Sequence, residues 1–266
     1  MDLTSIDRIR TARTRTDLVL GPGSAPLAGG TWLFSEQQPH LTELVDLTTL
    51  GWPPFEVGSD GLTLAATCTL RQLADLPPVP GWASQHLVLE CARSLVASEK
   101  IWDWATVGGN ICTALPAGAL ISFAVALDAT AVVWTADGGS REQPVAELVT
   151  GPRTTTLAPD EVLRSVVVSS EVLQAPAAFA RVALTRHGRS GAIVIGRRDA
   201  GGGLVVTVTG GVPRPYRFAF ADWPSADELH DAVDTVDDWY DDPHGAPDWR
   251  RAMSLRLAEQ VRGRLA

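Results

Sequence analysis

Two pairs of adjacent glycines constrain this sequence more than any other feature, because each lets the backbone pass close to another group. They are Gly29-Gly30-Thr31 and Gly108-Gly109-Asn110. Without a Cβ, such a segment brings its N–H groups near a bulky anion, and successive N–H groups form a concave nest for phosphate oxygens. Neither has the spacing of a Rossmann loop or a P-loop, and each alone is typical of an ordinary tight turn. Together, in separate parts of the chain, they predict a diphosphate held at a domain junction.

The charge balance excludes one class of partner. The 266 residues carry 22 Lys and Arg against 31 Asp and Glu, a net charge of −9, with no basic run of the kind that binds nucleic acid. Hydrophobic residues make up 45% and charged residues 20%, which is enough for a large core. No uninterrupted run of 18 apolar residues is present, so we expect no membrane span. Without a basic-then-apolar leader pattern, we expect a cytoplasmic protein.

Cysteine and histidine spacing predicts no metal site. Cys68, Cys91 and Cys112 have no C-x-x-C spacing, which argues against an iron–sulfur cluster or a zinc site on this chain. The five histidines have no metal-ligand spacing either. We therefore interpret the cysteines as small buried thiols.

The chain divides into three parts that together predict an α+β protein. We expect a small α/β unit at residues 1–53, a larger α+β unit at 54–172, and a unit with an antiparallel sheet and helices at 173–266. Proline and glycine clusters separate periodic segments within these units.

Individual elements follow from apolar periodicity and turn residues. The period of Ile6, Ile9 and Ala12 predicts a first helix. The other main elements expected are strands at 44–47, 62–64 and 131–134, β-rich segments at 179–184, 192–196 and 204–209, and helices at 70–76, 81–96, 120–127, 225–240 and 249–265. In the last helix one face is apolar and we expect the arginines on the opposite face. Both glycine pairs are expected as turns.

Two charged segments lie in the third unit. Ten carboxylates between Asp222 and Asp248 show no calcium-loop spacing, which indicates a solvated helical face or a docking surface. The basic cluster from Arg181 to Arg189, which includes His187, is the one positive patch suited to a phosphate or a carboxylate. A solvated turn is the alternative interpretation of that cluster.

Three separated motifs carry a resemblance to a known family. Leu27-Ala28-Gly29-Gly30-Thr31 with Leu44-Val45-Asp46-Leu47 resembles the first FAD loop and following strand of molybdenum-hydroxylase flavoprotein subunits. These are the medium subunits of carbon monoxide dehydrogenase and the FAD domain of xanthine dehydrogenase. Ala105-Thr106-Val107-Gly108-Gly109-Asn110-Ile111 is similar to the second FAD loop of that family. The segment from Asp242 to Arg251 resembles the opening of its last helix.

The resemblance implies a flavoprotein fold of the p-cresol-methylhydroxylase and vanillyl-alcohol-oxidase type. Two α/β subdomains would hold FAD between them, and a C-terminal domain with an antiparallel sheet and helices would follow. Carried over residue by residue, the first cofactor-binding loop comprises Ala28, Gly29, Gly30, Thr31, Trp32 and Leu33. The second comprises Thr106, Gly108, Gly109 and Asn110. Arg181 lies near the position of a basic residue that the family places close to the flavin.

Three departures from the family pattern affect the same site. Lys100-Ile101-Trp102-Asp103-Trp104 stands where the family has Gln-Ile-Arg-Asn. Pro116-Ala117-Gly118-Ala119 lacks the acid of the Pro-x-x-Asp segment, whose carboxylate contacts the cofactor in the family. Trp32 replaces a small or acidic residue. These changes indicate either a rebuilt FAD site in which tryptophans replace polar contacts, or a weakened one.

The resemblance implies an oxidoreductase subunit whose chemistry is that of its cofactor. It would carry FAD in a hetero-oligomer with an iron–sulfur subunit and a molybdopterin subunit, and would pass electrons to NAD, a quinone or oxygen. One alternative is a stand-alone FAD-dependent enzyme that acts on a small organic substrate. Another is a non-catalytic scaffold that has lost flavin. The residues themselves assign no catalytic role.

Overall fold

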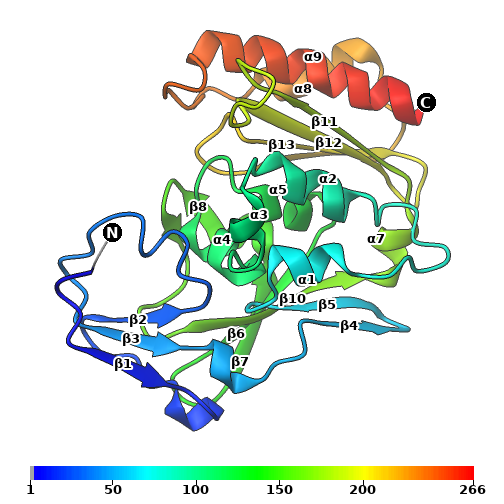
Figure 1. Cartoon of the computed structure of the whole chain (residues 1–266). Helices are drawn as coiled ribbons and strands as arrows, with labels where there is room; N and C mark the ends of the chain where they lie inside the picture. The colour runs from blue at the N-terminus through cyan, green and yellow to red at the C-terminus, as the bar shows by residue number, and fades with distance from the viewer. Residues whose placement is uncertain (1–2) are drawn as a thin grey trace.

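The computed structural model describes residues 3–266 and stacks helices and sheets in alternating layers. From the C-terminal end, two helices cover a four-stranded sheet, central helices lie beneath it, and a five-stranded sheet follows (Figure 1). A three-stranded sheet formed by the N-terminal segment lies beside the five-stranded one. The expected boundaries near residues 53 and 172 remain predictions.

The N-terminal sheet is parallel and has the order β1-β3-β2. Its strands are β1 (Arg8–Thr11), β2 (Ser24–Leu27) and β3 (Glu43–Asp46), with short 3-10 helices η1 (Arg15–Asp17) and η2 (Thr48–Leu50). The predicted strand at 44–47 is confirmed as β3. The predicted helix through Ile6, Ile9 and Ala12 is wrong, because β1 pairs along β3, whose Leu44 and Val45 are fully buried. Strand pairing to a buried neighbour overrides a short helical period.

The five-stranded sheet is antiparallel, with the order β4-β5-β10-β6-β7. Its strands are β4 (Phe55–Gly58), β5 (Gly61–Ala65), β6 (Thr130–Trp134), β7 (Ser140–Pro144) and β10 (Val162–Ser169). A two-stranded ribbon of β8 (Val149–Gly151) and β9 (Thr154–Thr155) lies nearby. The associated helices are α1 (Leu70–Ala74), α2 (Leu87–Ser94), α3 (Glu99–Trp102), α4 (Val107–Thr113), α5 (Ala119–Ala126), α6 (Val145–Leu148) and α7 (Ser170–Gln174).

Helix α5 is buried along its whole length, because it lies between the central helices and the C-terminal sheet. Helix α2 is shorter than the predicted 81–96. Both the N–H and the hydroxyl of Ser84 donate to the carbonyl oxygen of Leu173 at 3.0 Å, which holds residues before 87 in turns. Serine bonding to a distant backbone group competes with helix formation.

The C-terminal sheet is antiparallel in chain order and carries two helices on one face. Its strands are β11 (Ala177–Val182), β12 (Ala192–Arg198), β13 (Leu204–Thr209) and β14 (Tyr216–Phe220), and its helices are α8 (Ala226–Asp234) and α9 (Pro247–Leu265). The predicted hairpin strands are confirmed, and β14 is an addition. Helix α8 ends before the predicted residue 240.

The prediction that the arginines of α9 lie on its exposed face is wrong for one of them, Arg250. Leu257, Val261 and Leu265 pack inward as expected, but Arg250 is 1% exposed. Its guanidinium donates to the carbonyl oxygens of Gly191 and Gly210 and pairs with Asp242. The buried charge ties the start of α9 to the ends of β12 and β13.

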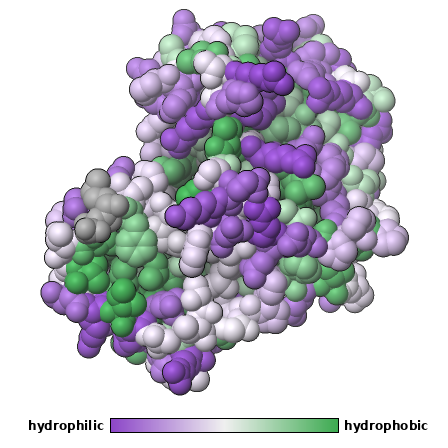
Figure 2. All heavy atoms as spheres, viewed as in Figure 1, coloured by the Kyte–Doolittle hydropathy of each residue, from purple (hydrophilic) through white to green (hydrophobic). Residues whose placement is uncertain are grey.

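The surface differs between the units. Figure 2 shows apolar side chains gathered over the N-terminal unit, where Ile9, Val19 and Phe34 are exposed. Within residues 3–266, no helix has the length and apolar character needed to cross a membrane.

Candidate functional site

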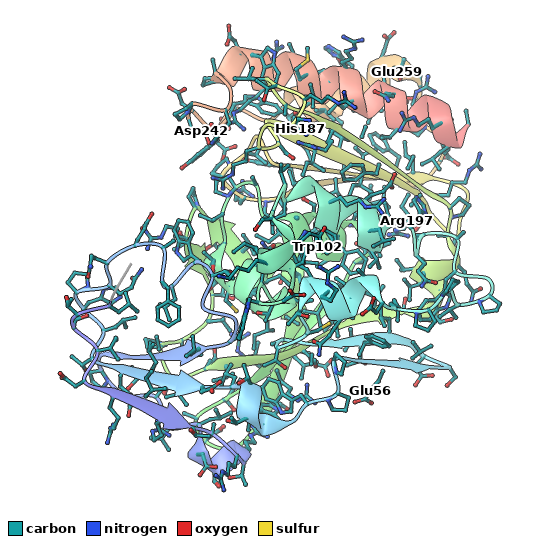
Figure 3. All side chains as sticks on the ribbon, in the orientation of Figure 1. Glu56, Trp102, His187, Arg197, Asp242 and Glu259 are labelled. Atoms are coloured by element: carbon teal, nitrogen blue, oxygen red, sulfur yellow. The ribbon has the colours of Figure 1, made fainter. Side chains whose placement is uncertain are left out.

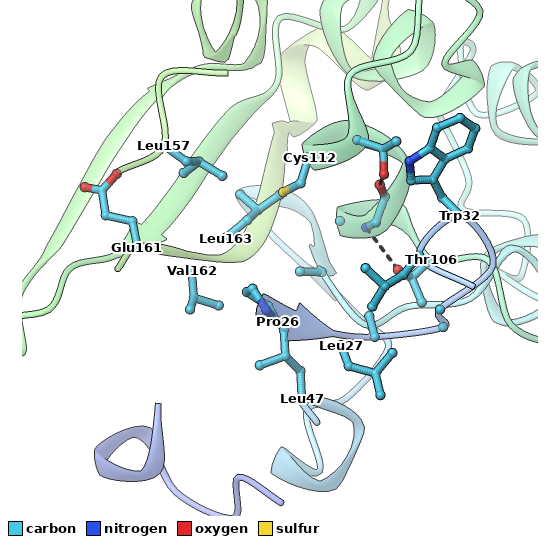
Figure 4. A pocket seen from close by; sticks show the side chains of 18 of the residues that line it. Pro26, Leu27, Trp32, Leu47, Thr106, Cys112, Leu157, Glu161, Val162 and Leu163 are labelled. Atoms are coloured by element: carbon cyan, nitrogen blue, oxygen red, sulfur yellow. Dashed lines mark hydrogen bonds between the residues drawn. The ribbon is translucent and has the colours of Figure 1, made fainter. Parts of the chain in front are cut away.

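The two glycine segments meet at a cavity of about 320 Å³ between the N-terminal sheet and the five-stranded sheet. The first segment follows β2, and the second begins α4 (Figure 4). Ten of the eleven residues predicted to bind the cofactor belong to these two segments. Nine of them line the cavity: Ala28, Gly29, Gly30, Thr31, Trp32, Leu33, Thr106, Gly108 and Gly109.

The first segment is fixed by a close backbone contact. An added Cβ on Gly29 would lie 1.5 Å from the carbonyl oxygen of Trp104, so no larger residue fits there. Gly30 has φ +68°, and a Cβ on it would meet the ring of Phe34. The sequence therefore needs both glycines to place this loop against the 104–106 segment.

The first segment also presents a row of unsatisfied donors. Across the described part of the chain, the backbone N–H groups of Gly29, Gly30 and Thr31 meet no hydrogen-bond acceptor. Three consecutive free N–H groups beside a cavity form the type of nest that binds phosphate oxygens. This geometry supports the diphosphate interpretation of the first glycine pair.

The second segment is not the isolated tight turn that we expected, because its glycines form the first turn of α4. Thr106 caps the helix: its Oγ1 accepts the N–H of Gly109 at 3.0 Å, as Figure 4 shows. The N–H of Gly108 donates to Ala66, and that of Asn110 to the carbonyl of Thr106. These donors are used internally. The segment instead offers a smooth backbone wall and the hydroxyl proton of Thr106.

The remaining walls of the cavity are largely apolar. Its lining includes Leu27, Leu47, Leu157, Val162 and Leu163. Sequence reasoning missed the contribution of 157–163, because these residues come into place through the pairing of β10 in the sheet. An apolar pocket beside a polar nest suits a ring system joined to a phosphate group.

Two titratable side chains lie in the wall of the cavity, Cys112 and Glu161, and neither presents an unpaired charge to a ligand. Burial raises the pKa of the Cys112 thiol to about 12, so it stays protonated at neutral pH. Hydrogen bonds from Arg141, and one from the N–H of Ala158, hold the pKa of Glu161 below its ordinary value. Its charge is paired with Arg141, which reduces repulsion of an anionic ligand.

The tryptophans that depart from the family pattern lie in different environments. Trp32 lines the cavity, and the guanidinium of Arg153 lies 5.6 Å from its ring centre. Trp102, on α3 in Figure 3, packs under Arg71. Trp104 is 57% exposed, and its backbone carbonyl makes the contact with Gly29. Of these three tryptophans, Trp32 is the one whose side chain can contact a ligand in the cavity.

The last two predicted residues lie outside this cavity and fix neighbouring segments. The Oδ1 of Asn110 accepts the N–H of Leu120 at 2.9 Å and so ties α4 to α5. Arg181 donates to the Oγ of Ser190 and to the carbonyl oxygen of Gly188. Burial lowers the pKa of Arg181 from its ordinary value. Arg181 therefore holds the loop between β11 and β12.

A second cavity of about 310 Å³ lies on the other side of α4. It is lined by Asn110 and Gly118 from the central helices, by Leu95 and Val96 after α2, and by His187 and Arg189 from the β11–β12 loop, among others. Val96 has φ +54°, a conformation that β-branched residues rarely adopt. Both cavities thus border the segment from 106 to 118.

Comparison with known proteins gives a consistent result. The family model described as the FAD binding domain in molybdopterin dehydrogenase matches residues 7–169. Xanthine dehydrogenase of Oryza sativa subsp. japonica is 31% identical over 134 residues, which are 48% of this chain and 9% of that protein. This chain therefore spans a small part of that relative.

Solved structures show the same fold over nearly the whole chain. A carbon monoxide dehydrogenase chain from Hydrogenophaga pseudoflava, which lacks the Mo-pyranopterin moiety, has a TM-score of 0.82 at 20% identity, covering 98% of this chain and 97% of that one. Quinoline 2-oxidoreductase from Pseudomonas putida 86 gives a TM-score of 0.81 at 17% identity, covering 100% of this chain and 99% of that one.

The likeness to these structures confirms the expected α+β fold. With the match over 7–169, the resemblance predicted from the glycine segments is confirmed, and the cofactor of the family is FAD. The chain belongs to the family of FAD-binding domains of molybdopterin dehydrogenases.

Proposed function

We propose that this protein carries FAD within a molybdenum-containing hydroxylase or dehydrogenase. An iron–sulfur partner would deliver electrons to its FAD, and NAD, a quinone or oxygen would accept them. The single observation that supports FAD placement best is the row of free N–H groups at Gly29, Gly30 and Thr31 beside the Thr106–Gly109 wall. When bound, the cofactor supplies the redox chemistry.

The residues of the first cavity fit the diphosphate and one ring system of FAD. The free N–H groups bind phosphate oxygens, and the Thr106 hydroxyl, whose oxygen already accepts from Gly109, donates its own proton to a phosphate. The apolar side chains around Leu47 and Leu163 enclose one ring system and exclude water. The pairing of Glu161 with Arg141 limits repulsion of the diphosphate.

The proposed partners are an iron–sulfur subunit and a molybdopterin subunit. The support comes from the matched proteins: the family model is named for molybdopterin dehydrogenases, and the carbon monoxide dehydrogenase chain matches this one from end to end. In such an assembly this chain's role is to bind and orient the flavin and to leave an edge open to donor and acceptor.

A stand-alone FAD-dependent enzyme is the second candidate, and two observations favour it. Trp32 lines the cofactor cavity in place of the family's small or acidic residue, and Ala119 is fully buried where the family has an acid. A scaffold that has lost flavin is the third candidate, although the free N–H groups of the first loop argue against it.

One purification separates the three candidates. The tagged full-length chain is isolated from its native host, and flavin, iron and molybdenum are quantified. Our proposal predicts one FAD with iron and molybdenum in constant ratio to the chain. A yellow protein free of both metals supports the stand-alone enzyme, and a colourless protein that takes up no added FAD supports the scaffold. Either result contradicts our proposal.

A further inference from the structure

The loop that follows β2 is held to the rest of the molecule by few contacts. Residues 31–36 lie in consecutive turns and belong to no strand or helix. In the described part of the chain, every hydrogen bond of these residues stays within residues 30–38. The loop nevertheless supplies Trp32 to the wall of the first cavity. A segment with so few distant contacts opens at a low cost in free energy.

One arginine from the β8–β9 hairpin reaches this loop. The guanidinium of Arg153 lies 5.6 Å from the ring centre of Trp32, and its Nη1 lies 3.8 Å from Oε2 of Glu36. Among the described residues, these are the only cation–π contact and the only ion pair that residues 31–36 make. We call Arg153 with these two contacts the Arg153 clamp. It joins the loop to a hairpin that is distant in the sequence.

The backbone of Arg153 is fixed beside the helix of the second glycine segment. Arg153 lies in the turn between β8 and β9 with φ +58°, a left-handed conformation that few residues other than glycine adopt. Its N–H donates at 2.8 Å to the carbonyl oxygen of Ala114, which ends α4 and is also left-handed, with φ +50°. Strained residues held by specific contacts cluster at ligand clamps and active sites. Because α4 begins with the second glycine segment, one helix fixes both a wall of the cavity and the base of Arg153.

The two contacts of the clamp are too exposed to contribute much to the stability of the fold. The side chains of Arg153 and Glu36 are 54% and 51% exposed, and ion pairs or cation–π contacts at such sites are weak. Contacts of this strength change the equilibrium between an open and a closed loop by about fivefold. They therefore suit a loop that has to open and close better than they suit a structural support.

We propose that Arg153 holds the 31–36 loop closed over the diphosphate and thereby sets how long FAD stays bound. The inference rests on the proposed function, because it takes the diphosphate to lie on the N–H groups of Gly29–Thr31. Opening of the loop moves Trp32 out of the wall and the N–H of Thr31 away from the phosphate, so FAD leaves through this opening. Arg153 is not among the residues that line the cavity and acts through Trp32, so it is a positioning residue.

The test compares two arginines that each lie over an aromatic ring. Arg153→Gln removes the clamp. Arg214→Gln is the matched control, because Arg214 is an exposed residue 4.5 Å from the ring centre of Tyr216 and lies outside the lining of the first cavity. Each full-length variant is loaded with radiolabelled FAD and chased with an excess of unlabelled FAD, and the label still bound is measured by rapid gel filtration.

The rate of FAD release carries the expected effect. We expect Arg153→Gln to release FAD about fivefold faster than wild type, and Arg214→Gln to release it at the wild-type rate. The association rate, followed by stopped-flow flavin fluorescence, should stay within about twofold of wild type in both variants, because contacts that hold a bound state act mainly on dissociation. Equal release from the two variants, with one FAD bound per chain, overturns the clamp and leaves the diphosphate site intact.

A double variant shows through which residue Arg153 acts. In a Trp32→Ala background, Arg153→Gln should change the release rate by less than about twofold, because the ring that it contacts is missing. The same fivefold effect in both backgrounds would place Arg153 directly on the ligand and would overturn its positioning role. A wild-type chain that binds no FAD overturns the proposed function, and this inference with it.

Discussion

The carbonyl oxygen of Trp104 occupies the space that a side chain at position 29 would need: a Cβ on Gly29 would lie 1.5 Å from it. Gly29 and Gly108 are 79 residues apart in the sequence. The backbone at Gly29 nevertheless packs directly against Trp104, which lies just before the second glycine segment. This contact brings the free N–H groups of the first loop opposite Thr106 and explains why both segments line one cavity.

Gly30→Val tests the first loop. Valine at φ +68° and against the Phe34 ring is strained by about 1–3 kcal/mol, which moves the loop but leaves the chain folded. We expect the variant to lose FAD. The matched control is Gly51→Val, because Gly51 has φ +64°, open space around it and no place in the cavity lining. Flavin content by absorbance and folding by circular dichroism are measured for both, and equal flavin content in the two variants contradicts the loop's role.

Gly109→Val tests the opposite wall. A Cβ on Gly109 would meet the Thr106 hydroxyl oxygen at 2.8 Å and displace the helix cap that fixes this residue. We expect flavin to be lost while the protein remains folded, because the rest of α4 packs through Val107 and Ile111. If Gly30→Val and Gly109→Val both keep one FAD per chain, the diphosphate does not lie where we place it.

Trp32→Ala tests whether a tryptophan has replaced a polar contact. The variant removes an apolar wall of the cavity and its stacking with Arg153, worth about 0.5–1 kcal/mol at an exposed site. We expect the Kd for FAD to rise about fivefold, measured by fluorescence titration. Trp104→Ala is the control, since that ring lies outside the cavity lining. Equal affinity in the two variants would show that the Trp32 ring does not contact the ligand.

Arg250→Met tests the buried cation of α9. The change leaves the carbonyls of Gly191 and Gly210 without their donor and Asp242 without its cation, so we expect a loss of about 3–5 kcal/mol in the free energy of unfolding. Arg251→Met removes a half-exposed pair with Asp234 and is expected to cost less than about 1 kcal/mol. Urea unfolding of both variants measures the difference, and similar losses would contradict the structural role of Arg250.

Alkaline pH is expected to weaken the fold through the thiol of Cys112, a partly buried residue in the cavity wall. The pKa of Cys112 is raised from 9.0 to about 12, so its contribution to stability is complete below pH 9 and is lost as the pH rises toward 12. Between pH 8 and pH 10, the wild type should lose about 1 kcal/mol more in the free energy of unfolding than Cys112→Ala. The same dependence on pH in both proteins would show that folding does not raise the pKa of the Cys112 thiol.

Much of the fold is predictable from the sequence where a pattern is local. The hairpins of the C-terminal sheet follow from β-branched runs broken by the glycine turn at 199–203, and β3 from its apolar run. The strand β1 was not predictable, because its conformation depends on pairing with β3, which lies more than 30 residues away. The burial of Arg250 could not be predicted for the same reason: the carbonyls of Gly191 and Gly210 that it contacts flank β12 and β13 and lie 59 and 40 residues away in the chain.

The site divides in a similar way. The glycine segments are evident in the sequence, because adjacent glycines let the backbone pass close to a bulky group. The sequence does not reveal that the N–H groups of the first segment are free while those of the second are bonded. That difference depends on where Ala66 and Thr106 lie in space. The apolar wall from 157 to 163 likewise depends on how the sheets pack together.

Amide hydrogen exchange with and without FAD tests the central claim most directly. The N–H groups of Gly29, Gly30 and Thr31 are free in the chain alone, whereas those of Gly108, Gly109 and Asn110 are already bonded. We therefore predict that one equivalent of FAD slows exchange strongly in a peptide covering 28–34 and much less in one covering 106–113. Unchanged exchange in 28–34, with FAD bound at one equivalent, would show that the diphosphate does not lie on this loop.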